Sequence, residues 1–69
     1  MITHTLLRFF KYQHLPQHLQ DISKPFAELA ESIAARIDPN ACEHQMNEYD
    51  AGLRKLLEAK DCIVRAAIP

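Results

Sequence analysis

The sequence is poor in glycine and lacks tryptophan: it has one Gly and no Trp in 69 residues. Tight turns between strands need residues that tolerate a positive φ, so this shortage argues against a protein built from β-hairpins. Apolar residues make up 48% of the chain and charged residues 25%, the balance of a folded protein rather than a disordered one. The length limits the chain to one domain, and a single core of this size rarely suffices without cross-links or partner chains.

Cysteine is also scarce, with Cys42 and Cys62 as its two positions. If both lie on one helix, they are about 30 Å apart, whereas a disulfide needs Cα atoms within roughly 7 Å. The sequence has no C-x-x-C pair, so a structural zinc site has little support. We therefore expect reduced thiols, a cytoplasmic location and stabilisation by homo-oligomerisation.

The chain also lacks a strong net charge and a long apolar run. A formal net charge of −1 with neutral histidines disfavours binding to DNA or RNA polymers, which depends on many Lys and Arg contacts to phosphates. A small anion needs only one local cluster of donors, so such a ligand stays possible. The longest apolar run is far too short to cross a bilayer, and we expect no membrane partner.

What the sequence does contain is helical periodicity, and it predicts an all-α antiparallel hairpin. The first helix is expected over residues 16–37, with a kink or break near Pro25. Ser23 could cap the second piece of a broken helix. Its apolar stripe consists of Leu15, Leu19, Ile22, Phe26, Leu29, Ile33 and Ile37.

The second helix is expected over residues 39–67, with Asp38 as its N-cap and Pro39 as its first residue. Its apolar stripe consists of Cys42, Met46, Tyr49, Leu53, Leu56, Ile63 and Ala67. Lys60 interrupts this stripe: either its stem lies along the seam, or it faces a ligand cavity between chains. Gly52 in the helix interior could mark a place where another backbone comes close.

Residues 1–13 are predicted to form an arm rich in aromatic residues, lying against a helix or a neighbouring chain. Packing two helices together leaves the second apolar row of Leu57 and Val64, and the arm aromatics, exposed to water. An exposed apolar strip normally marks an interface, which again favours a homo-oligomer.

Candidate binding residues cluster in the arm. Tyr12 could stack on a base, with Phe10, Lys11 and His14 nearby and cations available for phosphate. Tyr12 could equally plug the base of the hairpin. Arg65 lies near the end of the second helix, where the helix dipole favours a cation. It could also pair with Asp61, four residues earlier.

Metal binding and catalysis have little support. His14, His18 and His44 lack the spacing of converging ligands. No nucleophile has a base beside it and no Gly-rich phosphate loop occurs, so we expect no enzyme activity, catalytic residue, metal or cofactor.

Three stretches carry a resemblance to a known family: Phe10-x-Tyr12-x-His14-x-Pro16, Leu29-Ala30-x-x-Ile33, and residues 53–66, which end in Val64-Arg65-Ala66. Over residues 10–69 the chain resembles short bacteriophage proteins with the hairpin domain shared by anti-CBASS and anti-Thoeris sponges. The resemblance implies a non-enzymatic protein that binds cyclic nucleotide immune signals of the bacterial host and holds them intact. It also implies a helical homo-oligomer, commonly a hexamer.

Two site residues follow from the resemblance. The family's base-stacking aromatic falls on Tyr12, and its arginine before the small C-terminal residues falls on Arg65. The family's phosphate-facing lysine falls on Phe26 or Ala27, so Lys24 is the nearest basic residue. The expected ligands are cyclic di- or trinucleotides or cyclic ADP-ribose isomers. The alternative is a small helical adaptor that binds a host or phage protein through the apolar strip.

Overall fold

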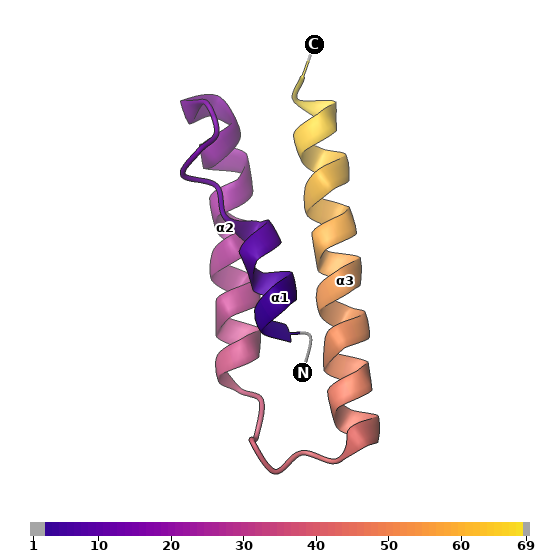
Figure 1. The fold of residues 1–69 in the computed structure, drawn as a ribbon. Coiled ribbons are helices and arrows are strands. Elements are labelled where there is room, and N and C mark those ends of the chain that lie inside the picture. Colours follow the sequence, from indigo (N-terminus) through magenta and orange to yellow (C-terminus); the bar gives the residue numbers. More distant parts are fainter. Residues whose placement is uncertain (1–2, 69) are drawn as a thin grey trace.

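The computed structural model describes the backbone of residues 3–68 and the side chains of residues 5–68, and these residues form an all-α hairpin with a short N-terminal helix (Figure 1). The elements are α1 (Thr3–Leu7), the 3-10 helix η1 (Arg8–Phe10), α2 (Gln17–Ala35) and α3 (Glu43–Ala66). Helices α2 and α3 lie side by side in opposite directions, and α1 with η1 lies over them. The predicted hairpin is confirmed. Residues 1–2 of the predicted arm, and Pro69, lie outside the described residues.

Helix α2 begins one residue after the predicted start, because Pro16 is its N-cap in an extended conformation. The side chain of Gln20 fixes the chain before the helix by donating hydrogen bonds to the carbonyls of Leu15 (2.8 Å) and Gln13 (3.3 Å). The helix then runs unbroken through Pro25, so the predicted break there is wrong. Asp21, whose carbonyl loses its donor to this proline, is exposed, as is Pro25, so water can supply the missing bond.

Helix α3 begins at Glu43, and the prediction of a start at Pro39 is wrong. Asp38 forms a turn instead of a helix cap: its Oδ1 accepts from the Asn40 N–H at 2.8 Å, and its carbonyl accepts from the Ala41 N–H at 2.9 Å. Such local bonds compete with helix initiation. The cap falls on Cys42, whose backbone N–H donates to Oε1 of Gln45 at 3.0 Å.

The core lies where the arm meets both long helices. Phe10 is only 2% exposed, and it packs with Leu6, Ala27, Ala30 and Leu53. The small side chains of Ala27 and Ala30 leave room for the arm on α2. The expectation that the arm aromatics stay exposed is therefore wrong for Phe10, although Phe9 is half exposed.

The second apolar row of α3 is less exposed than predicted. Leu57 is half-buried and packs against the core, and Val64 is also half-buried. The arm supplies part of the cover of Leu57, because the core against which it packs includes Leu6 and Phe10. Over residues 3–68, no helix is both long enough and apolar enough to cross a membrane.

Candidate functional site

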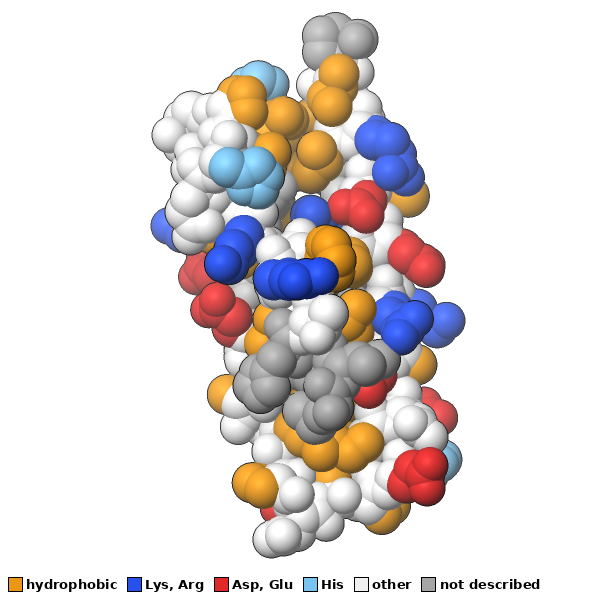
Figure 2. Space-filling model, viewed as in Figure 1, with side chains coloured by type: hydrophobic (Ala, Val, Ile, Leu, Met, Phe, Trp, Pro, Cys, Tyr) orange, Lys and Arg blue, Asp and Glu red, His pale blue; other side chains and the backbone are white. Residues whose placement is uncertain are grey.

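A pocket of about 310 Å³ opens between the arm and α2. Arg8, Lys11, Tyr12 and Gln13 form its arm wall, and Ala27 and Glu31 form its α2 wall. Leu7 and Phe10 supply apolar surface to the same pocket. Figure 2 shows Lys and Arg side chains over the arm and Asp and Glu side chains over the neighbouring part of α2. One hollow therefore combines an aromatic ring, two cations and a carboxylate.

The two cations are available to a ligand. Among the described residues, neither Arg8 nor Lys11 has an ion pair, and both are exposed. The guanidinium of Arg8 lies 5.1 Å from the centre of the Phe9 ring, which holds it at the surface of η1. Lys11 follows directly in an extended conformation, with its N–H donating to the Arg8 carbonyl at 3.4 Å.

Hydrogen bonds hold the backbone N–H and the backbone carbonyl of Tyr12. Its N–H donates to Oε1 of Gln13 at 3.2 Å, and its carbonyl accepts from the Leu15 N–H at 3.0 Å. The half-buried side chain packs against the core while lining the pocket. A ring fixed in this way can stack on a planar ligand without first losing its own freedom.

The pocket gathers half of the predicted binding residues. Phe10, Lys11 and Tyr12 line it, with Phe10 as a buried part of its wall rather than a free stacking ring. His14 and Lys24 are exposed and do not line it.

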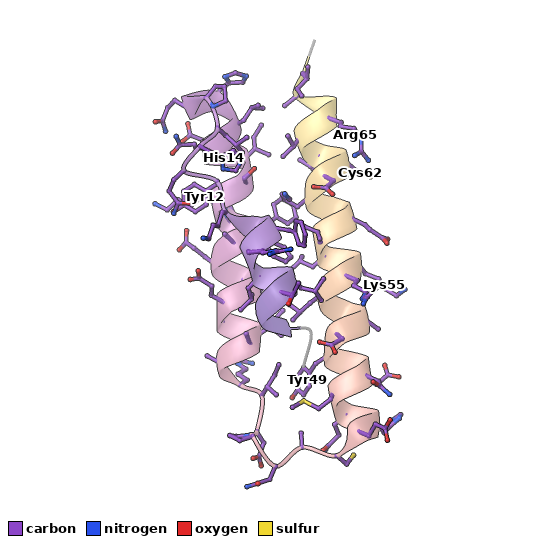
Figure 3. The ribbon with its side chains drawn as sticks, in the orientation of Figure 1. Tyr12, His14, Tyr49, Lys55, Cys62 and Arg65 are labelled. Carbon is purple, nitrogen blue, oxygen red and sulfur yellow. The ribbon has the colours of Figure 1, made fainter. Side chains whose placement is uncertain are left out.

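Arg65 lies elsewhere, near the C-terminal end of α3 and away from Tyr12 and His14 (Figure 3). Its Nη2 donates to Sγ of Cys62 at 3.3 Å. The expected pair with Asp61 is wrong, because Asp61 Oδ1 lies 3.1 Å from Nζ of Lys60 instead. Arg65 does not line the pocket that contains Tyr12.

Three polar lining residues were not predicted: Arg8, Gln13 and Glu31. Arg8 and Gln13 flank the predicted cluster in the arm, so the sequence alone could have indicated them. The sequence could not have indicated Glu31, because its place in the pocket depends on where the arm packs on α2.

Lys60 contacts the arm from α3, and its place in a ligand cavity between chains stays a prediction. Its side chain is 12% exposed, and its Nζ donates a hydrogen bond to the Phe9 carbonyl at 3.0 Å. This carbonyl is in the last turn of the arm helix, where unpaired carbonyls attract a cation. Lys60 thus ties α3 to the arm that forms the pocket wall.

A second hollow, of about 370 Å³, lies along α3 beside His44, Gln45, Glu48 and Tyr49. All of its lining comes from one helix, and it contains no Lys or Arg. No group of three potential metal-ligating side chains occurs in the part of the chain that the structure describes.

Comparisons of the chain with protein-family models, with curated proteins and with solved structures each found no match.

Proposed function

We propose that the protein binds a cyclic nucleotide signal, a cyclic di- or trinucleotide or a cyclic ADP-ribose isomer, in the pocket between the arm and α2. It holds the ligand without cleaving it and so withholds it from bacterial anti-phage defence. The observation that carries the proposal is the joint presence of Tyr12, Arg8 and Lys11 in one pocket. The family resemblance supplies the class of ligand and its sequestration.

The chemistry of the pocket suits one nucleotide unit. A tyrosine ring stacks on a base with about 1–3 kcal/mol of favourable energy, and Arg or Lys binds phosphate through charge-assisted hydrogen bonds. A volume of about 310 Å³ is at the small end of ligand sites. A cyclic dinucleotide therefore exceeds one pocket, and a second copy of the chain would hold its other half.

A symmetric homo-oligomer, a hexamer by resemblance, is part of the proposal. A two-fold axis repeats Tyr12 and the two cations, just as a cyclic dinucleotide repeats its base and phosphate. Phe9, Leu29, Ile63 and Ile68 are each about half exposed, which provides apolar surface for contacts between copies.

Calorimetry tests the proposal with a panel of cyclic di- and trinucleotides and cyclic ADP-ribose isomers. We expect binding of at least one member, and Tyr12→Ala should weaken it about 5- to 150-fold. Tyr49→Ala is the matched control, because Tyr49 is also half-buried but lies on α3 away from the pocket. A mass spectrum of ligand released by heat should show the added compound intact. Absence of binding across the panel would contradict the proposal.

The second candidate function is a helical adaptor that binds a host or phage protein. The exposed side chains of Ile63 and Ile68 near the end of α3 favour it, because each is about half exposed. A partner protein that co-purifies with the chain and is lost in Ile63→Gln, but kept in Tyr12→Ala, would support the adaptor over the nucleotide-binding protein.

A further inference from the structure

Glu31 is the one acidic side chain that lines the pocket, opposite a wall with two cations. It is exposed, and in the described part of the chain its carboxylate has neither a hydrogen bond nor an ion pair. Arg8 and Lys11 line the same pocket but do not approach it within ion-pair distance. Among the described residues, the Glu31 carboxylate and the Lys11 ammonium therefore have no ion-pair partner, and the Arg8 guanidinium lies over the Phe9 ring. The carboxylate and the cations can face different groups of one ligand.

An acidic group in a pocket for an anion needs a reason, because it repels phosphate. Glu31 lies one helical turn after Ala27, on the α2 wall, whereas both cations lie on the arm wall. A nucleotide held by its phosphate and by stacking on Tyr12 would lie along the arm wall, and the edge of its base would extend toward α2. The edge of the base, not the phosphate, would then meet the carboxylate.

An ionised carboxylate only accepts hydrogen bonds, and it has two oxygens side by side. Guanine presents two adjacent donors on its pairing edge, N1–H and the N2 amino group. Adenine presents one amino group beside an acceptor nitrogen, and cytosine has the same donor–acceptor pair. Uracil places a single N–H between two carbonyls. Guanine is thus the base that matches both carboxylate oxygens.

We propose that Glu31 selects a guanine base in this pocket, so that the preferred ligand is a guanine-containing cyclic nucleotide. This inference rests on the proposed function, and it adds the identity of the base. Tyr12 would stack on the guanine face, while Arg8 and Lys11 would bind its phosphate.

The test compares cyclic di-GMP with cyclic di-AMP, which carry the same charge and the same sugar–phosphate ring. The wild-type protein should bind cyclic di-GMP about 5- to 150-fold more tightly, the range given by a bidentate contact to a base. Glu31→Gln removes one acceptor and adds a donor, so its amide suits adenine instead. The ratio of the two dissociation constants should fall at least tenfold or reverse.

The ratio is the readout because Glu31→Gln also removes a negative charge, which strengthens binding of both probes alike. Glu28→Gln is the matched control: Glu28 is an exposed carboxylate on α2 outside the pocket lining, and its removal should leave the ratio unchanged. Both variants should keep the wild-type helical signal in circular dichroism, since both side chains are exposed.

Equal wild-type affinity for the two probes, or an unchanged ratio in Glu31→Gln, would overturn the role of Glu31 and leave the proposed function standing. Binding of neither probe would overturn the guanine inference. If the rest of the cyclic nucleotide panel also failed to bind, the proposed function would fall with it.

Discussion

Lys60 is the residue that connects the long hairpin to the arm. Its Nζ donates to the Phe9 carbonyl at 3.0 Å from a side chain that is 12% exposed. Lys60→Met keeps the apolar stem and removes the donor, so we expect the free energy of unfolding to fall by about 1–2 kcal/mol. Urea denaturation measures this loss.

The matched control for Lys60 is Lys55→Met, since Lys55 is an exposed lysine on the same helix (Figure 3). It should change stability by less than about 0.5 kcal/mol. Amide hydrogen exchange should also accelerate in η1 of Lys60→Met, ahead of α2 and α3. An arm that exchanges at the wild-type rate in Lys60→Met would show that this contact does not hold it.

Ser23 presents the opposite case, a buried polar group that the fold leaves unpaired. It is 1% exposed, and its Oγ has no hydrogen-bond partner among the residues that the structure describes. Because an unpaired buried hydroxyl costs free energy, Ser23→Ala should raise the free energy of unfolding by about 1 kcal/mol. Ser32→Ala, at an exposed position of the same helix, should change it by less than about 0.5 kcal/mol. A loss of stability in Ser23→Ala would mean that the hydroxyl has a partner in solution.

For single residues, the sequence predicted the site residues that are neighbours along the chain. The arm cluster of Lys11 and Tyr12 does line one pocket. Glu31 escaped prediction because its place in the site comes from the packing of the arm on α2, between residues about 20 positions apart in the chain. The sequence suggests a cap role for Ser23, but α2 is unbroken and has no helix start at this residue.

The arm is the element whose stability decides whether the pocket exists. Phe10 anchors it, being 2% exposed and packed with Ala27, Ala30 and Leu53. Phe10→Ala should cost about 3–5 kcal/mol, which is a large share of the total stability of a domain this small. We expect the arm to detach or the whole chain to unfold, as monitored by thermal circular dichroism.

Phe9→Ala is the matched control for the arm, because Phe9 is the adjacent ring on the same short helix and is 50% exposed. It should cost much less than Phe10→Ala. Equal losses for the two variants would contradict the packing of the arm described above.

The helices themselves were predictable where apolar residues recur at helical spacing, without interruption in α2 and with one interruption, at Lys60, in α3. The ends of the helices were less predictable, because Asp38 and Pro39 suit a turn as well as a helix start. In the structure they form a turn, which the hydrogen bonds from the Asn40 N–H and the Ala41 N–H to Asp38 stabilise. The helical state of the arm was missed because its aromatic residues show no clear period.

The whole molecule is long and thin, with dimensions of 43 × 17 × 15 Å. Among the side chains that the structure describes, its core cluster has five buried residues, Leu6, Phe10, Ala27, Ala30 and Leu53. A core of this size supplies limited stability to a single chain. Gly52 is exposed on α3, and apart from its two chain neighbours and the backbone of its own helix, no described atom lies within 4 Å of where a Cβ would stand. The close approach expected at Gly52 therefore does not occur within the chain, and a second copy is the remaining candidate.

We expect the melting temperature to rise with protein concentration, because association stabilises only the folded chain. A hundredfold increase in protein concentration favours assembly by about 2.7 kcal/mol. Shared between two chains of this length, this energy raises the melting temperature by roughly 5–10 °C.

Ile63→Gln should weaken this dependence on concentration, since Ile63 is 50% exposed and contributes apolar surface for contacts. Glu58→Gln, an exposed polar position on the same helix, should preserve it. Sedimentation velocity measures the same association directly. A single monomeric species at every concentration, with a constant melting temperature, would mean that the arm alone covers enough of the hairpin and that any ligand is held by one pocket.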